Sequence, residues 1–387
     1  MIALCILLMI GMTGCGNKNQ DNQRTREMEQ WVEEANLTGK ESAEELYQAA
    51  LGEDTLVIYS VSSRVFDVKE SFEKEYPGLT VEVKDIRGQD LVNMLLTNYE
   101  EGNFDCDLVL CSDSDGSLQK KLLEPGLIYT YIPWDIESHM KEEHTEDALD
   151  IVGELLMLFY NENVFDESPI RNIWELTEEQ YKGKIIMASP LSSFSTYGFC
   201  STLLSESQKI AEAYETYSGD ELQIPEGKTA GEVFWEQASE NIVFTNSSDE
   251  VLEGIGGSGG DEYSIGIMIS SKMRYQELGY HFAPIYQLNP FSAVYTPNSI
   301  TIAGGSKNVN CAKLFIRYLL GETDGTGEGI TPYMTRGTWS VRTDIPDANP
   351  VPLSDIDYIP MNKTYLFENR DAMNSFWQEL LKRNGSE

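Results

Sequence analysis

TLVIYS, residues 55–60, begins the part of the chain that decides the fold. It is a short β-rich run, and apolar residues at helical spacing follow it until Pro77-Gly78, which predicts a helix that stops there. A second strand is expected over Leu79–Lys84, a second helix over Gln89–Tyr99 and a third strand over Asp107–Cys111. This strand–helix order predicts a parallel α/β sheet with right-handed crossover connections.

A second α/β unit follows, and an apolar strand over residues 154–160 leads into it. Its β-rich runs and helical patterns alternate as they do in the first unit. The expected strands are 184–188, 242–245, 262–269 and 298–303, and the expected helices are 197–204, 248–253 and 311–320.

Hydroxyl side chains gather where the expected strands end, and ligands of open parallel sheets bind beyond those ends. A helix start offers free N–H groups to an anion, although capping alone explains one serine per helix. The loop over 192–196 has four hydroxyls in five positions, which is more than capping requires. We expect the solute to contact Ser62, Ser63, Arg64, Ser112, Asp113, Ser192, Ser193, Ser195, Thr196, Ser247, Ser248, Ser270 and Ser271.

Composition narrows the classes of partner. The chain has 387 residues, 41% of them hydrophobic, which is enough for two domains with real cores. Its formal net charge of −36 argues against nucleic acid and against a basic membrane patch. We expect neither a cofactor nor a protein-bound metal.

The N-terminus looks like a processing signal. Ile2–Ile10 is apolar but too short to span a membrane, and Met12–Cys15 follows it. The pattern resembles the lipobox of bacterial lipoproteins, which predicts a lipid on Cys15, a polar tether over Gly16–Arg26 and an extracytoplasmic, lipid-anchored protein. No basic residue precedes the apolar run, and Met12 replaces the usual leucine. A degenerate secretory signal with a chance cysteine stays the alternative.

Beyond the expected signal the chain has four cysteines, Cys106, Cys111, Cys200 and Cys311. We interpret them as small buried apolar residues. Cys106 and Cys111 are expected in one strand and on opposite faces of it. Whether any two of the four are bridged stays open.

Catalytic motifs are weak. Gly254–Gly259 matches a dinucleotide fingerprint, but a helical pattern precedes it and a strand follows, which inverts the required order. Ser117–Lys120 matches S-x-x-K without the companion motifs of acyl-serine enzymes. The three histidines are His139, His144 and His281, and we expect the first two on a solvated acidic surface. A secreted serine hydrolase is the alternative of another class.

Several stretches together resemble a known family. NIWELT, residues 172–177, and YKGKIIMASP, residues 181–190, are similar to the second-lobe signature of family 1 extracellular solute-binding proteins. The resemblance is closest to the ferric-ion-binding branch and its relatives for phosphorylated or phosphonate solutes. Stretches that agree with it are 56–60, 72–79, 107–110, 244–254, 296–320 and 339–346.

This resemblance implies a type II periplasmic-binding-protein fold, in which two α/β lobes joined by crossover strands close on a solute. It implies a monomer that delivers a small solute to the permease of an ABC importer and has no catalytic activity. The expected division is a signal peptide (1–15), a tether and lead-in helix (16–52), lobe 1 (53–155 and 275–325) and lobe 2 (156–274 and 326–387).

One departure concerns the solute. Ferric-binding members place His or Gln after the first strand, Glu after the third and a Tyr pair on the second lobe. The matching places here hold Ser62–Arg64, Ser112–Asp113 and Ser270–Ser271. Serine hydroxyls are poor ligands for a ferric ion, whereas with Arg64 and Arg274 they suit a phosphate, phosphonate or carboxylate. Asp113 suits an amine or sugar hydroxyl of the same solute. A ferric ion or ferric complex stays the alternative.

Overall fold

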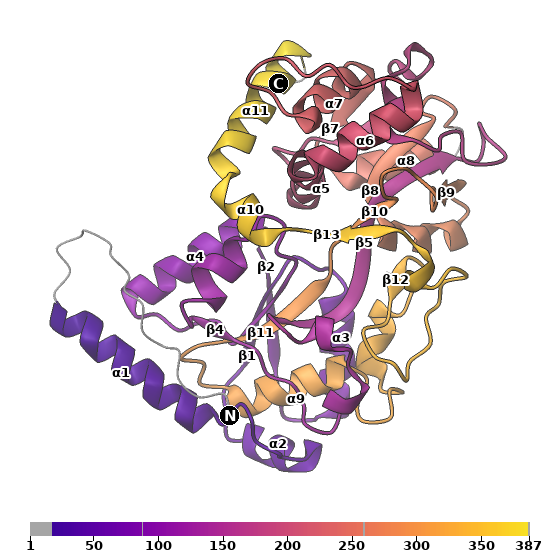
Figure 1. Cartoon of the computed structure of the whole chain (residues 1–387). Helices are drawn as coiled ribbons and strands as arrows, with labels where there is room; N and C mark the ends of the chain where they lie inside the picture. Colours follow the sequence, from indigo (N-terminus) through magenta and orange to yellow (C-terminus); the bar gives the residue numbers. More distant parts are fainter. Residues whose placement is uncertain (1–17, 87, 258–259, 386–387) are drawn as a thin grey trace.

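The computed structural model describes residues 18–86, 88–257 and 260–385, and it shows two α/β lobes joined by one long strand (Figure 1). That strand, β5 (Leu149–Asn161), passes from one lobe into the other. The expected signal peptide and Cys15 lie outside the described residues. Helix α1 (Lys18–Ala35) covers most of the segment expected to be a tether. None of the described helices is long and apolar enough to cross a membrane.

Lobe 1 confirms the strand–helix order predicted for the first unit. Its sheet runs β2–β1–β3–β11–β5, with β1 parallel to β2 and β3, and β11 antiparallel to its neighbours. Apolar residues of α2, α3 and α9 pack on one face, and those of α4 pack on the other. The elements are β1 (Leu56–Ser60), β2 (Val81–Asp85), β3 (Leu108–Cys111), β4 (Ile128–Tyr129), β11 (Asn298–Ala303), α2 (Ala43–Ala50), α3 (Val65–Glu75), α4 (Gly88–Glu101) and α9 (Val309–Leu319).

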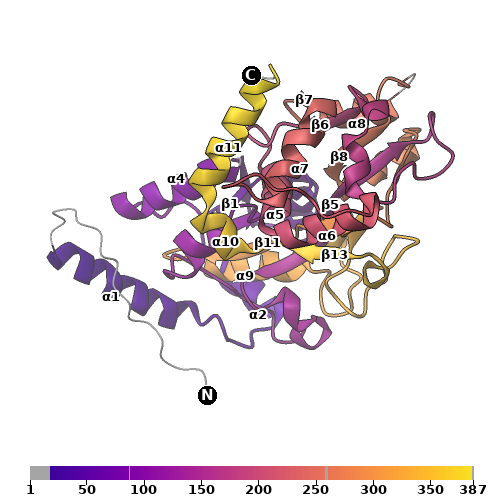
Figure 2. The ribbon, with the colours of Figure 1, turned by 45° about the horizontal axis from the view of Figure 1, so that its top comes forward.

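Lobe 2 continues the sheet as β5–β8–β6–β7. Buried aromatic rings fill its main core, where Trp235 and Trp377 lie 5.2 Å apart between ring centroids. The C-terminal helix is thereby fixed to lobe 2, because Trp377 belongs to it (Figure 2). The elements are β6 (Ile185–Ala188), β7 (Ile242–Thr245), β8 (Ile265–Ile269), α5 (Phe194–Ser205), α6 (Ser207–Ser218), α7 (Ala230–Ala238), α8 (Ser248–Gly256), α10 (Lys363–Glu368) and α11 (Arg370–Arg383).

Two segments belong to a different lobe from the one that the sequence predicted: residues 282–295 pack on lobe 2, and residues 328–333 pack on lobe 1. β9 (Phe282–Pro284) and β10 (Ala293–Tyr295) pair with the lobe 2 half of β5, so residues 282–295 lie with lobe 2. The helical turn Glu328–Tyr333 packs on α3 and α9, and Tyr333 belongs to the lobe 1 core. We propose lobe boundaries moved accordingly. The remaining strands are β12 (Thr338–Trp339), which pairs with β5, and β13 (Tyr358–Pro360), which pairs with β10.

The four cysteines Cys106, Cys111, Cys200 and Cys311 are buried and unbridged. Burial raises the pKa of the Cys106 and Cys200 thiols well above the ordinary value, as expected of apolar core residues. The predicted opposite facing of Cys106 and Cys111 is wrong, because both pack in one cluster. Strand β3 begins at Leu108, so the two-residue alternation does not reach Cys106.

The lobes touch each other in this structure. Gly88, at the start of α4 in lobe 1, lies so close to Phe194 of α5 that an added Cβ would come within 3.0 Å of that ring. Gly198 of α5 meets the backbone and side chain of Ser114 in lobe 1 just as closely. The structure is therefore a closed arrangement of the two lobes.

Candidate solute-binding site

The carboxyl ends of the strands of both lobes point to the junction between them. In lobe 1 these are the ends of β1 and β3, and in lobe 2 the ends of β6, β7 and β8. β8 runs antiparallel to β5 and ends opposite Leu156, near the middle of the joining strand. The predicted hydroxyl clusters therefore follow strand ends on the side of the sheet that faces the junction.

Arg64 is the most informative predicted residue. Its Nη2 donates to Oε1 of Glu154, on the joining strand, over 2.9 Å, and its guanidinium carbon lies 4.5 Å from the centroid of the Tyr333 ring. Its Nη1 is buried and has no hydrogen-bond partner among the residues that the structure describes. A buried donor without a partner is costly, and a ligand or water normally satisfies it. The guanidinium is therefore held in place, while its Nη1 group donates to none of the described residues.

Glu154 and Tyr333 complete this cluster. Glu154 is buried on β5 and also accepts a hydrogen bond from the Asn298 amide. The Tyr333 hydroxyl donates to Oγ of Ser62 over 3.3 Å. Burial raises the pKa of Tyr333 to about 12, despite the opposing charge of Arg64, so the ring stays neutral at physiological pH. We define Ser62, Arg64, Glu154 and Tyr333 as the arginine cluster.

The serine loop of lobe 2 divides into capping and non-capping hydroxyls. Ser193 is the N-cap of α5, where its Oγ accepts from the N–H of Thr196 over 3.4 Å and from the Thr196 hydroxyl over 2.9 Å. Ser192 is exposed and donates to the carbonyl of Ser189. Among the described residues, the Ser195 hydroxyl bonds to Ser193 alone, over 3.4 Å. Capping accounts for Ser193, but it gives no role to Ser195.

The other predicted residues of lobe 2 have structural partners. Ser247 caps α8 by accepting from the N–H of Glu250 over 3.3 Å, and Ser248 is the first residue of that helix. Ser270 is fully buried, where its hydroxyl donates to the carbonyl of Gly337 and accepts from the N–H of Leu155 over 2.9 Å. Ser271 is buried, and its carbonyl accepts from Arg274 over 2.7 Å. The Ser270 hydroxyl thus already donates to another residue of the protein, the Gly337 carbonyl.

In lobe 1, Ser63 is exposed and Ser112 is partly exposed at the end of β3. The two carboxylate oxygens of Asp113 accept from the N–H groups of Leu118 and Gln119, over 3.2 and 3.0 Å. Burial raises the pKa of Asp113, and these hydrogen bonds oppose the shift. Asp113 therefore organises its own loop, and this role reduces its capacity to bind a solute.

A cavity of about 310 Å³ adjoins Asp113 between lobe 1 and the segment before α10. Five carboxylates and Lys363 line it, among other residues. Two of its lining residues, Asp150 and Tyr295, contact His144, whose Nδ1 lies 3.1 Å from Asp150 and 3.3 Å from the Tyr295 hydroxyl. The expectation of a solvated His144 is wrong, because these neighbours bury it, whereas His139 is partly exposed. The Ser299 hydroxyl also donates to Asp150, over 2.6 Å.

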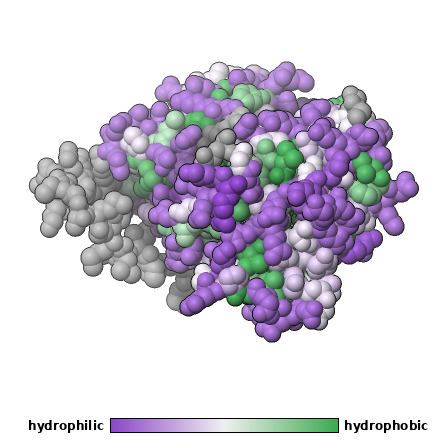
Figure 3. Space-filling model, turned by 90° about the horizontal axis from the view of Figure 1, so that it is seen from above, coloured by the Kyte–Doolittle hydropathy of each residue, from purple (hydrophilic) through white to green (hydrophobic). Residues whose placement is uncertain are grey.

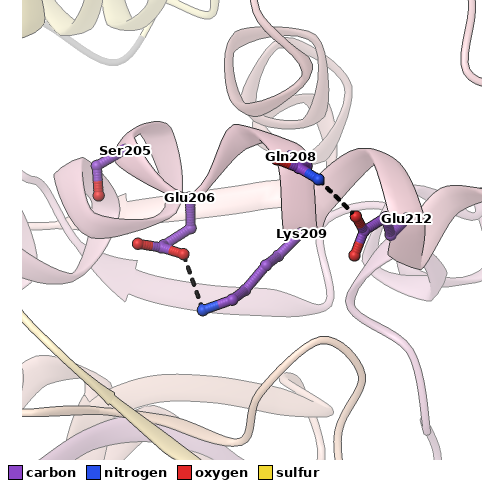
Figure 4. A pocket seen from close by; sticks show the side chains of 5 residues that line it. All are labelled: Ser205, Glu206, Gln208, Lys209 and Glu212. Carbon is purple, nitrogen blue, oxygen red and sulfur yellow. Dashed lines mark hydrogen bonds and ion pairs between the residues drawn. The ribbon is translucent and has the colours of Figure 1, made fainter.

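A second hollow, of about 340 Å³, lies between the end of α5 and α6. Figure 4 shows its lining, in which Lys209 reaches Glu206 over 2.9 Å and Gln208 reaches Glu212 over 2.9 Å. These side chains satisfy one another, and the hollow is far from the strand ends. Seen from above, the surface is mostly hydrophilic, with apolar residues in small separate patches (Figure 3). Neither this hollow nor these apolar patches is a better candidate for the solute site than the region between the lobes.

No family model and no curated protein matches the chain. Among solved structures, iron-bound HitA from Pseudomonas aeruginosa is 15% identical with a TM-score of 0.60, over 84% of this chain and 99% of HitA. Apo ferric ion-binding protein A from Pasteurella haemolytica is 13% identical with a TM-score of 0.59, over 84% of this chain and 97% of that one. The substrate binding protein of an ABC transporter from Agrobacterium tumefaciens is 15% identical with a TM-score of 0.61, over 85% and 94%.

The chain has the two-lobed fold of the type II periplasmic binding proteins. At these identities the likeness shows the fold alone, and it confirms the architecture that the sequence resemblance implied. In this fold the arginine cluster lies where lobe 1 meets the joining strand. Sequence reasoning found Ser62 and Arg64 but missed Glu154 and Tyr333. Glu154 sits inside an apolar strand run, a position where a charge is uncommon, and this was the available signal.

Proposed function

We propose that the chain is the solute-binding protein of an ABC importer and captures a small anionic organic solute between its two lobes. The observation that carries the proposal is the unused Nη1 donor of Arg64, buried beside the strand ends. A guanidinium pairs well with phosphate, phosphonate or carboxylate oxygens. The two-lobed fold supplies the closing motion, and the strand ends of lobe 2 supply hydroxyl and N–H donors opposite it.

The proposed solute contacts are Arg64, Ser62 and Ser63 from lobe 1 and Ser195 with the adjacent loop from lobe 2. Ser112, Ser192, Thr196, Ser248 and Ser271 stay in the proposed set as residues of the same strand ends. Glu154 and Tyr333 are proposed as positioning residues, because they fix the plane of the guanidinium. We further propose that the protein works as a monomer outside the cytoplasm, anchored by a lipid on Cys15.

An enzymatic role has little support. No hydrogen bond joins a serine hydroxyl to a histidine among the described residues, and Asp150 lies between Ser299 and His144. The described residues therefore contain no directly hydrogen-bonded serine–histidine pair of the kind that activates a serine nucleophile. Gly254 and Gly256 lie at the end of helix α8. In a dinucleotide site the glycines instead follow a strand and begin a helix.

A ferric solute is the second candidate, because the iron-bound neighbour shares the fold. The described residues contain no group of three or more His, Cys, Asp or Glu side chains that could hold a metal ion. A bare ferric ion would thus find no cluster of His, Cys, Asp or Glu ligands among the described residues, whereas an anionic ferric chelate would use the same arginine. The two candidates differ in whether iron is present in the bound species.

The test is a thermal-shift screen of phosphorylated sugars, phosphonates, glycerophosphates, small carboxylates and ferric chelates, followed by calorimetric titration of each hit. A ligand at one hundred times its dissociation constant stabilises the folded state by about 2.7 kcal/mol. Arg64→Met should abolish the calorimetric signal of an anionic hit. Lys69→Met, in the helix α3 that begins directly after Arg64 and at a partly exposed ion pair with Glu73, should leave it unchanged. A hit that binds Arg64→Met equally well would refute the assigned site, and turnover of a hit would favour an enzyme.

A further inference from the structure

The segment of residues 361–370, which contains α10 and the first residue of α11, connects the two lobes on one side of their junction. We call it the C-terminal strap. After it, α11 is anchored in lobe 2 through Trp377, while the strap itself lies against α4 and the loop after β3 in lobe 1 (Figures 1 and 2). The strap is therefore attached to both halves of a fold whose function requires them to move apart.

Arg370, in the strap, contacts three side chains of lobe 1. Its Nη1 donates to Oγ of Ser117 over 3.2 Å and its Nη2 donates to Oε1 of Gln89 over 2.5 Å. Its Nε lies 3.4 Å from Oδ2 of Asp115. All three partners belong to lobe 1, and Asp115 is almost completely buried. Hydrogen bonds to an ionised group are about twice as strong as neutral ones, so this contact favours the closed arrangement.

Lys363 makes a second charged contact. Its Nζ lies 3.5 Å from Oδ2 of Asp147 in lobe 1, beside the acidic cavity. The backbone of the strap also fits closely, because an added Cβ on Gly116 would come within 2.1 Å of the carbonyl oxygen of Lys363. Gly116 has a φ of +74°, which also favours glycine there. Charged and steric contacts thus coincide along the strap.

The net negative charge of the chain makes these attractive contacts between the lobes important for closure. With 64 acidic and 28 basic residues, bringing the two lobes together increases electrostatic self-repulsion. The strap places two of the few cations against carboxylates of lobe 1, at Asp115 and Asp147. Cations of one lobe that meet anions of the other offset the repulsion only while the lobes are closed.

We propose that the C-terminal strap is an electrostatic latch, in which Arg370 and Lys363 hold lobe 1 to lobe 2 and set the fraction of closed protein. None of the contacts of the latch involves a solute. Its consequence for binding rests on the proposed function: a latch that raises the closed fraction raises the apparent affinity for the solute by the same factor. The salt dependence of that affinity then contains a component that does not come from the charge of the solute.

The test is small-angle scattering of the solute-free full chain, which measures the radius of gyration. Arg370→Gln removes the charge but keeps a good helix former at the start of α11. We expect it to lower the closed-to-open ratio about tenfold, equivalent to about 1.4 kcal/mol, and to increase the radius of gyration. Arg383→Gln is the matched control, because Arg383 is on the same helix and pairs with Glu236 and Glu379 inside lobe 2. It should scatter like the wild type.

Two further measurements use the same readout. Raising salt to about 1 M shortens the screening length to about 3 Å. It weakens the latch and the repulsion between the lobes together, so the difference in radius of gyration between wild type and Arg370→Gln should shrink. Gln89→Ala removes an accepting partner from lobe 1, and its effect should not add to that of Arg370→Gln, since both act on one contact. Equal radii for wild type and Arg370→Gln at both salt concentrations would overturn the latch. Because no solute is used, that failure leaves the proposed function standing, and a failed solute screen leaves the latch standing.

Discussion

Replacing Arg64 by methionine should destabilise the protein strongly even without a solute. The side chains of Arg64 and Glu154 are only 13% and 5% exposed, so the substitution leaves a buried carboxylate without its cation. Removing one partner of a buried ion pair typically costs about 3–5 kcal/mol. The Asn298 amide still donates to Glu154, so we expect about 3 kcal/mol, part of which is the lost stacking on Tyr333.

A double-mutant cycle separates the ion pair from simple loss of packing. Glu154→Gln keeps the shape of the side chain and an acceptor for Asn298, but it removes the charge. The double variant Arg64→Met/Glu154→Gln buries no unpaired charge, so it should be more stable than Arg64→Met alone. Urea unfolding followed by tryptophan fluorescence and circular dichroism gives the three free energies of unfolding. The reasoning is refuted if Arg64→Met costs less than about 1 kcal/mol and the two substitutions are additive.

Three other predictions concern the anchor, the serine loop and acid stability. Cys15→Ala should move the protein from the membrane fraction to the soluble fraction, and unchanged fractionation would contradict lipidation. Ser193→Ala should cost about 1 kcal/mol of unfolding free energy as a lost cap, whereas Ser195→Ala should preserve stability and weaken calorimetric binding of a screened anion about tenfold or more; the reverse pattern would contradict the assignment. Hydrogen bonds from Arg342 lower the pKa of Asp344, so its stabilisation is present above pH about 4 and is lost as pH falls. Asp344→Asn should therefore flatten the acid loss of urea stability, and an unchanged acid profile would contradict this.

The architecture could be predicted because the strands and helices of each lobe have clear local sequence patterns. Strand runs such as residues 55–60 and helices with one apolar face recur in order, and every strand and helix expected in the two units is present, with ends shifted by a few residues. The lobe boundaries were harder, because β5 is shared by both lobes and late segments return to it. Nothing in the local pattern of residues 282–295 or 328–333 indicates which lobe they pack against.

The candidate site could be predicted only in part for the same reason. A strand end can be located from local sequence, which found Arg64 and the serine loop. The partners of Arg64 are 90 and more residues away, and hydrogen bonds such as that from Tyr333 to Ser62 span 271 positions. Sequence pattern also cannot separate a capping serine from a binding one, since both occur at a helix start. The structure identifies Ser193 as the cap of α5 and gives Ser195 no capping role.

The central claim is that the lobes enclose one small anion held by Arg64. Native mass spectrometry of the full chain, purified without refolding, tests it most directly, because any carried-over solute adds its own mass and can be released and identified. We predict one bound anionic molecule per chain in the wild type and in Lys69→Met, and none in Arg64→Met. A bound species retained by Arg64→Met, or one that is cationic or neutral, would contradict the account.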